Sequence, residues 1–119
     1  MRVLLIGAGG VGSAVVGIAA RRNFFDAMVV ADYDEARALR AVERVASDLR
    51  FSAAQVDASS AEAVAALCRT HQITHVLNAV DPRFVMPIFN GALAADADYL
   101  DMAMSLSVAH PTDPYTQCG

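Results

Sequence analysis

The fold is decided by the stretch RVLLIGAGGVG at residues 2–12, where an apolar run leads directly into a glycine-rich turn. A continuous apolar run predicts a parallel strand that is covered on both faces. Gly7, Gly9 and Gly12 follow the pattern G-x-G-x-x-G and lead into an expected helix over residues 11–22. The first glycine allows a tight turn, the second lets the backbone approach a pyrophosphate, and the third lets the helix pack on the sheet. Free N–H groups at the start of the helix favour such an anion.

An acidic residue stands where the next strand is expected to end. Residues 27–31 form a second apolar run, and Asp32 follows it, about 20 residues after the last glycine of the turn. A carboxylate here accepts hydrogen bonds from the adenosine ribose hydroxyls and repels a 2′-phosphate. Tyr33 and Asp34 offer no positive charge, and Arg37 is already a turn into the next helix. The sequence therefore favours NAD over NADP, with Asp34 expected to cap the helix.

Apolar patterns continue to alternate along the chain. Further strands are expected at residues 51–56, 75–80 and 99–101, separated by helices. Ser59 and Glu62 have the spacing of a capping box. Residues 82–86 are expected to form a loop or a kinked first turn, with regular helix from Pro87 to about Ala95, because proline inside a helix removes a hydrogen bond. Strands alternating with helices predict a doubly wound α/β fold of the Rossmann type: five parallel strands in the order 3-2-1-4-5 between two helical layers.

Polar residues end the third and fourth expected strands, on the carboxyl side where ligands of this fold bind. Asp57, which is followed by Ala58, either accepts a hydrogen bond from the adenine amino group or is an ordinary turn aspartate. Asn78 and the Ala79 backbone are expected beside the nicotinamide ribose, because the fourth strand neighbours the first across the switch point. Strand-end hydrogen bonding is the alternative role for Asn78.

The composition favours one small domain without nucleic-acid or membrane partners. The chain has 119 residues, of which 55% are hydrophobic and 18% charged, and its net charge is −4. No basic run is present, so binding to a phosphate backbone is not expected. No apolar run approaches the ~20 residues of a membrane helix. Met1 leads directly into the first strand without room for a signal peptide, so a cytoplasmic location is expected.

Neither a catalytic set nor a metal site is expected. The spacing of the histidines matches no metal site or triad: they are His71, His75 and His110. Cys68 lies in an apolar helical pattern and is expected in the core. Asp101 ends the fifth expected strand and Ser105 follows it, and both are expected to be solvated residues rather than part of a substrate pocket.

Several of these segments together resemble the saccharopine dehydrogenase family. They are GAGGVG at residues 7–12, ADYD at 31–34, QVDA at 55–58, Asn78-Ala79 and DYLDMA at 98–103. The resemblance extends to about Ser107. Members of this family are oxidoreductases that form or cleave a secondary amine between an amino acid or polyamine and an oxo compound. Hydride passes between the nicotinamide and an imine carbon.

The resemblance implies a role for each candidate cofactor-binding residue. Asp32 would bind the ribose, Asp57 and Ala58 the adenine region, and Asn78 and Ala79 the nicotinamide side. The glycine turn would bind the pyrophosphate; its residues are Gly7, Ala8, Gly9, Gly10, Val11 and Gly12. The family domain is often labelled NADP-binding, which conflicts with the NAD preference drawn from Asp32.

The resemblance also implies that cofactor binding and substrate binding belong to different domains of a longer enzyme. Residues 1–104 would be the NAD(P)-binding Rossmann domain, and the polar segment 105–119 would lead to a substrate and catalytic domain outside this chain. The amino-acid or polyamine substrate would be bound through that domain, so turnover by this chain alone is not expected. We also expect an apolar surface where the other domain would pack, and weak self-association into a homodimer.

Two other functions remain open at this point. A regulatory NAD(H)-binding module of the potassium-transport type shares the fold, the glycine turn and the acids after the second and third strands. A dehydratase or epimerase with tightly held NAD uses the same fold, because fold does not fix chemistry.

Overall fold

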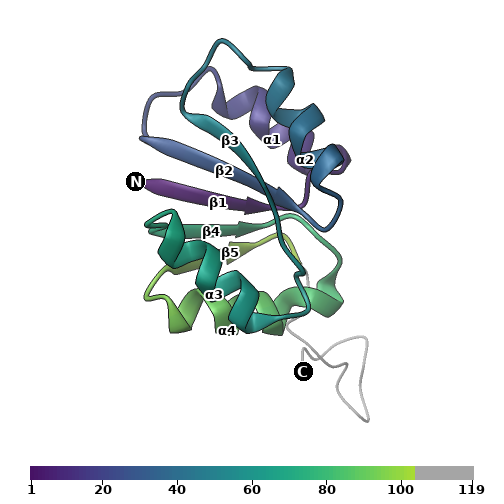
Figure 1. Ribbon diagram of the computed structural model, residues 1–119, viewed down its shortest axis with the longest axis vertical. Helices are drawn as coiled ribbons and strands as arrows, with labels where there is room; N and C mark the ends of the chain where they lie inside the picture. Colours follow the sequence, from purple (N-terminus) through teal and green to yellow (C-terminus); the bar gives the residue numbers. More distant parts are fainter. Residues whose placement is uncertain (104–119) are drawn as a thin grey trace.

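Five parallel strands form the centre of the molecule, in a computed structural model that describes residues 1–103. Their order across the sheet is β3-β2-β1-β4-β5 (Figure 1). The strands are β1 (Arg2–Ile6), β2 (Ala27–Asp32), β3 (Phe51–Gln55), β4 (His75–Asn78) and β5 (Asp98–Asp101). This order confirms the doubly wound α/β sheet. The segment 105–119 that was expected to lead to another domain lies outside the described residues.

Helices cover both faces of the sheet, as Figure 1 shows. The helices are α1 (Gly10–Ala19), α2 (Glu35–Glu43), α3 (Ala61–Thr70), α4 (Val85–Ala94) and the short 3-10 helix η1 (Pro82–Phe84). Side chains alternate between the two faces of a strand, and each face has its own core. Val3 and Leu5 of β1 pack with α1 and α2, whereas Leu4 and Ile6 pack with α3 and α4.

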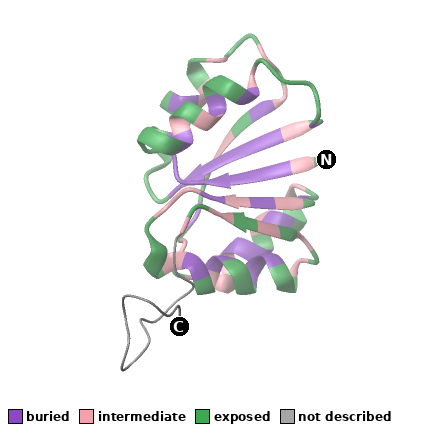
Figure 2. Cartoon of the chain, turned by 180° about the vertical axis from the view of Figure 1, so that it is seen from behind, coloured by how far each residue is buried: buried purple, intermediate pink, exposed green. Residues whose placement is uncertain are grey.

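Burial is greatest in the central strand β1 and its neighbour β2, and it falls toward the edges of the sheet (Figure 2). β1 and β2 are buried almost along their whole length, whereas residues of the edge strand β5 alternate between exposed and half-buried. Parallel strands covered on both faces have this continuous apolar character. Among residues 1–103, no helix has the length and apolar content needed to cross a bilayer.

The start of α3 differs from the expected capping box. The N-cap is Ser60 rather than Ser59, and the Ser60 hydroxyl accepts a hydrogen bond from the Ala63 N–H at 3.1 Å. Ser59 instead donates its hydroxyl to Asp57. The capping-box prediction was therefore wrong by one residue, because two adjacent serines compete and Ser59 is held in the preceding turn. The expected cap of α2 is confirmed: the Asp34 carboxylate accepts from the Ala36 N–H at 3.0 Å.

α4 begins two residues earlier than the sequence predicted. The expected kinked turn is the 3-10 helix η1, and α4 already starts at Val85, so Pro87 lies inside its first turn. The N–H groups of a first turn have no intrahelical partner, so a proline is tolerated there. Other boundaries moved by a few residues: β3 and β4 end at Gln55 and Asn78, and α1 ends at Ala19.

Candidate functional site

The glycine turn connects the carboxyl end of β1 to α1 and leaves no room for side chains at two positions. Gly7 has a φ of +104°, and a Cβ placed on it would lie 2.6 Å from Val80 Cγ1 and 2.8 Å from the Ala79 oxygen. A Cβ on Gly12 would lie 1.7 Å from the Gly7 oxygen. Both positions therefore require glycine, one for the turn and one for the close approach of α1.

The same turn is open at its tip. A Cβ on Gly9 or Gly10 would meet no atom within 4 Å. Gly9 is the N-cap of α1; no side chain caps this end, and its first turn contains no acidic residue. Uncapped N–H groups at a helix N-terminus attract an anion. The turn therefore combines a tight, fixed base with an open tip that suits a pyrophosphate.

Asp32 fastens the glycine turn to β2. The residue is buried, with 7% exposure. One carboxylate oxygen accepts a hydrogen bond from the Ala8 N–H at 2.8 Å, and the other accepts from the Asp34 N–H at 2.9 Å. These contacts place the carboxylate at the carboxyl end of β2, directly beside the turn.

Arg37 brings a positive charge to Asp32, which the sequence did not predict. Its Nη1 lies 3.9 Å from Asp32 Oδ1, and half of the arginine side chain is exposed. Arg37 belongs to the first turn of α2, and helical side chains lean toward the N-terminus of their helix. The guanidinium therefore reaches back toward the end of β2. Sequence spacing alone had placed it too far along the helix.

A pocket of about 460 Å³ brings several of the expected residues together at this edge of the sheet. That volume is in the usual range of ligand sites. Gly7, Asp32, Asp57 and Ala58 all line it. The other lining residues are Ile6, Tyr33, Arg37, Ser59, Val80 and Phe84. The remaining predicted site residues are not part of the lining: Ala8, Gly9, Gly10, Val11, Gly12, Asn78 and Ala79.

Asp57 acts as a turn aspartate in this structure. One of its oxygens accepts hydrogen bonds from the Ser59 hydroxyl at 2.6 Å and the Ser59 N–H at 2.9 Å. These two bonds hold the pKa of the Asp57 carboxyl below its ordinary value. The carboxylate is therefore ionised at neutral pH and keeps acceptor capacity toward the pocket. Its contact with adenine stays a prediction.

Asn78 is hydrogen-bonded to the protein through both its amide oxygen and its amide nitrogen. It is 1% exposed; its Oδ1 accepts from the Val80 N–H at 2.9 Å, and its Nδ2 donates to the Tyr99 hydroxyl at 3.0 Å. The Ala79 N–H donates to the Ile6 oxygen at 2.8 Å. The strand-end role of Asn78 is therefore observed, and the nicotinamide contact of Asn78 and Ala79 stays a prediction.

The remaining candidates do not form a second reactive site within residues 1–103. No group of His, Cys, Asp or Glu in that range is arranged to hold a metal ion. Cys68 is buried with a free thiol whose pKa is raised by that burial, which confirms its expected place in the core. His110 and Ser105 lie outside the described residues.

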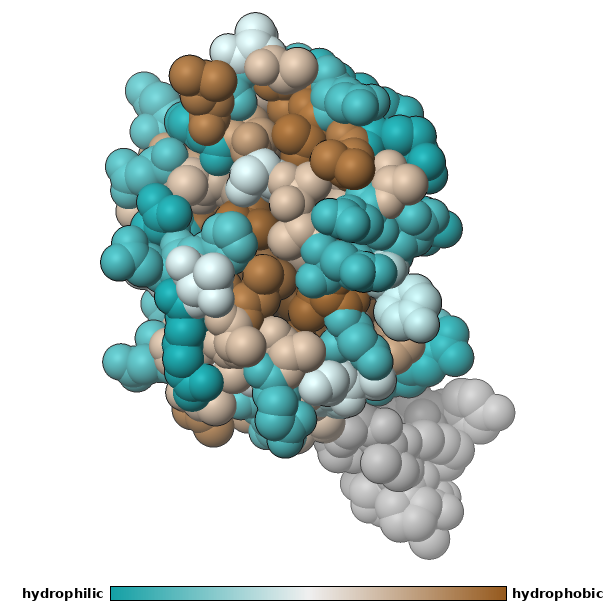
Figure 3. Space-filling view, viewed as in Figure 1, coloured by the Kyte–Doolittle hydropathy of each residue, from teal (hydrophilic) through white to brown (hydrophobic). Residues whose placement is uncertain are grey.

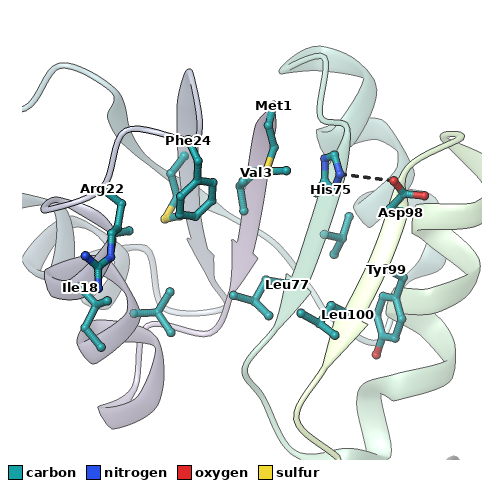
Figure 4. Close-up of a pocket in the computed structure, with 14 residues that line it drawn as sticks. Met1, Val3, Ile18, Arg22, Phe24, His75, Leu77, Asp98, Tyr99 and Leu100 are labelled. Carbon is teal, nitrogen blue, oxygen red and sulfur yellow. Dashed lines mark ion pairs between the residues drawn. The ribbon is translucent and has the colours of Figure 1, made fainter.

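A separate apolar groove of about 390 Å³ lies on the sheet face beside α1 (Figure 4). Its floor comes from β1, β4 and β5, and it includes none of the expected cofactor-binding residues. Arg22 stands at one side of the groove, and the ion pair between His75 Nε2 and Asp98 Oδ2, at 3.3 Å, stands at the other. An apolar surface is therefore present on this face of the sheet, and its role in packing against another domain or in self-association stays a prediction.

Known proteins resemble this chain at the level of the fold. Apo histidine-tagged saccharopine dehydrogenase (L-Glu forming) from Saccharomyces cerevisiae has a TM-score of 0.73 at 19% identity, over 86% of this chain and 21% of that chain. A putative epimerase from Bacteroides thetaiotaomicron has a TM-score of 0.65 at 22% identity, over 84% of this chain and 45% of that chain. Quinate dehydrogenase from Corynebacterium glutamicum in complex with NAD has a TM-score of 0.52 at 19% identity, over 83% of this chain and 43% of that chain.

This chain therefore spans less than half of each of these solved structures. A comparison with curated proteins gives no match. The model of the saccharopine dehydrogenase NADP binding domain family, in contrast, matches residues 3–117, which is nearly the whole sequence. The chain belongs to the saccharopine dehydrogenase NADP-binding domain family.

Proposed function

We propose that this chain is the cofactor domain of an oxidoreductase that transfers hydride to or from an imine or secondary amine of an amino-acid or polyamine substrate. The observation that carries the proposal is the glycine turn, fixed at Gly7 and Gly12 and open at Gly9, in a chain of this family. When bound, the nicotinamide supplies the hydride chemistry. The chain itself binds and orients the dinucleotide.

The geometry supports one placement of the dinucleotide. The pyrophosphate lies on the open tip of the turn and the N-terminus of α1, and the adenosine half enters the pocket between Asp32 and Asp57. The nicotinamide half points toward the Asn78-Ala79 end of β4, which is adjacent to β1. The residues assigned to cofactor binding are Gly7, Ala8, Gly9, Gly10, Val11, Gly12, Asp32, Asp57, Ala58, Asn78 and Ala79.

The position of Arg37 favours binding of NADP. The sequence favoured NAD because the Asp32 carboxylate repels a 2′-phosphate and no positive charge was expected beside it, yet the Arg37 guanidinium lies 3.9 Å from that carboxylate. Half of the arginine side chain is exposed, so the ion pair is weak and the guanidinium is free to turn toward a ligand. We therefore propose that the domain accepts NADP(H), with Arg37 pairing with the 2′-phosphate.

Binding of the dinucleotide is tested with two glycine variants that differ in one respect. A Cβ at Gly9 or at Gly17 meets no protein atom, so both alanine variants are expected to fold. Only the Cβ at Gly9 enters the space assigned to the pyrophosphate. In calorimetric titrations with NADPH and NADH, Gly9→Ala is expected to lower the affinity by about tenfold or more, a loss of about 1.4 kcal/mol. Gly17→Ala is expected to bind like the wild type. Equal affinity of both variants, or no binding by the wild type, would refute the proposed site.

Substrate handling is proposed to reside in other parts of the enzyme. Residues 1–103 provide an open nucleotide site, and this chain spans 21% of the yeast saccharopine dehydrogenase chain that it resembles. An open site cannot exclude water from a hydride transfer. The regulatory module and the dehydratase or epimerase remain alternatives, and no feature of residues 1–103 favours either of them over the oxidoreductase.

Weak self-association through the apolar groove is proposed as well. Exposed apolar residues line it, and Arg22 and Asp98 stand on opposite sides (Figure 4). A two-fold arrangement of two copies brings the arginine of each copy opposite the aspartate of the other. The occupant that fits this arrangement is therefore a second copy of the chain.

A further inference from the structure

A chain of hydrogen bonds connects the edge strand β5 to the glycine turn. The Val80 N–H donates to Asn78 Oδ1 at 2.9 Å, and Asn78 Nδ2 donates to the Tyr99 hydroxyl at 3.0 Å. The Asp101 carboxylate lies close enough to the Tyr99 hydroxyl to raise the pKa of that group. Because the Val80 N–H can only donate, it fixes the orientation of the Asn78 amide, and the direction of every following bond is then determined.

The end of this chain lies against the turn that is assigned to the pyrophosphate. Val80 Cγ1 and the Ala79 oxygen are the atoms that a Cβ on Gly7 would meet, at 2.6 and 2.8 Å. The backbone that Asn78 holds therefore forms one wall of the glycine turn. Asp32 forms the opposite anchor through the Ala8 N–H. The turn is fixed from β2 on one side and from β4 on the other.

Tyr99 is held firmly enough to anchor this wall. Its ring packs edge-on against Phe89 of α4, with ring centroids 5.5 Å apart and an interplanar angle of 86°. Burial, together with the nearby Asp101, raises the pKa of Tyr99 to about 12. The hydroxyl therefore keeps its proton at physiological pH while its oxygen accepts from Asn78. Consecutive hydrogen bonds of this kind strengthen one another.

We propose that Tyr99 is a positioning residue for the dinucleotide site: through Asn78 it holds the Asn78-Ala79-Val80 backbone, which sets the width of the glycine turn and the place of the nicotinamide half. This inference rests on the proposed function. Asp101 lies beside the Tyr99 hydroxyl and raises the pKa of that group, and its carboxylate accepts a hydrogen bond from the Ala103 N–H at 2.9 Å. Tyr99 itself touches neither the reacting atoms nor the pyrophosphate.

The first test needs no ligand and uses the variant Tyr99→Phe, which keeps the ring and removes the hydroxyl. Hydrogen exchange at the Val80 amide is measured by NMR in this variant and in Leu100→Ala. Leu100 lies on the same strand, is 65% exposed and takes no part in the hydrogen-bond chain. Tyr99→Phe is expected to speed Val80 exchange roughly tenfold, because Asn78 loses an acceptor and loosens. Equal exchange in the two variants would overturn the proposal, whatever the protein binds.

The second test separates positioning from general stability. Titrations compare NADPH with 2′,5′-ADP, which carries the adenosine half only. Tyr99→Phe is expected to weaken NADPH binding about five- to tenfold and 2′,5′-ADP binding less than twofold. Equal weakening of both ligands would show a merely structural role. If wild-type protein binds neither NADPH nor NADH, the proposed function fails, and the exchange measurement still decides whether Tyr99 holds the turn.

Discussion

Asp32 stabilises the glycine turn whether or not a cofactor is bound. Its carboxylate accepts from the N–H groups of Ala8 and Asp34, and it is 7% exposed. In Asp32→Ala the Ala8 N–H is left buried without a partner, so we expect a loss of about 1–3 kcal/mol in the free energy of unfolding. Urea denaturation followed by circular dichroism measures this change.

Asp34→Ala is the matched control for that variant, because it removes the helix cap two residues after Asp32. Loss of an N-cap costs about 1 kcal/mol. Dinucleotide affinity is expected to fall in Asp32→Ala and to stay unchanged in Asp34→Ala. An unfolding free energy of Asp32→Ala equal to that of the wild type would contradict the anchoring role.

Arg37 is expected to determine how tightly the domain binds the 2′-phosphate of NADPH. An arginine pairs with phosphate through charge-assisted hydrogen bonds, so Arg37→Gln should weaken NADPH binding about tenfold, or about 1.4 kcal/mol. NADH binding should change less than twofold. Arg40→Gln, one turn further along α2, controls for net charge. Parallel calorimetric titrations give the result, and tighter binding of NADH that is indifferent to Arg37 would restore the NAD assignment drawn from the sequence.

The sequence alone revealed the residues whose role depends on spacing. Gly7, Gly12 and Asp32 were predictable because the turn, the close approach of α1 and the end of β2 follow from local patterns. Arg37 was not, since its role depends on the lean of a helical side chain. The partnership of Asn78 with Tyr99 was not predictable either, because it requires β4 and β5 to be paired in a register that local patterns do not specify.

At the scale of elements, the contact between α3 and α4 depends on one glycine. A Cβ on Gly91 would lie 2.6 Å from Val64 Cβ and 2.8 Å from the Ala61 oxygen. Gly91→Ala is therefore expected to push the helices apart and to destabilise the fold by about 1–3 kcal/mol, the usual cost of overpacking. The gain in helix propensity offsets up to about 1 kcal/mol of this.

Gly17→Ala provides the comparison for Gly91→Ala, because it makes the same substitution in a helix where the Cβ meets nothing. It is expected to raise the free energy of unfolding by up to about 1 kcal/mol. The two variants should therefore shift the urea midpoint in opposite directions. A stabilising effect of Gly91→Ala would show that the α3–α4 contact adapts to the added methyl group.

Element order was predictable because apolar runs alternate with amphipathic stretches, and a parallel sheet buries those runs on both faces. The exact first and last residues of the helices were harder to predict from the sequence. Ser59 and Ser60 both satisfy the local rule for a cap, and the hydrogen bonds of Ser59 to Asp57 decide between them. Pro87 was read as the start of regular helix, whereas η1 shifts that start to Val85.

For the molecule as a whole, the two faces of the sheet are covered unequally. α3 and α4 lie over one face, whereas α1 and α2 leave the opposite face open along β4 and β5, where the groove lies. In the view of Figure 3, hydrophilic side chains dominate the margins and apolar ones gather toward the middle. Exposed apolar residues outside the groove include Leu39, Leu49 and Leu93. To locate a contact between two copies, a variant of a groove residue must therefore be compared with a variant of an exposed apolar residue outside the groove.

Ile18 and Leu39 make that comparison, because both are helical aliphatic residues of similar exposure, 50% and 48%, and only Ile18 lines the groove. Self-association with a dissociation constant on the order of 0.1 mM suits an interface of this small size. Sedimentation velocity at rising concentration should show self-association for the wild type and Leu39→Lys, and not for Ile18→Lys.

Charge swaps test the two-fold geometry: Arg22→Asp and Asp98→Arg should each weaken association, and the double variant should restore it. A wild type that stays monomeric at millimolar concentration, or a double variant weaker than either single one, would rule out this arrangement.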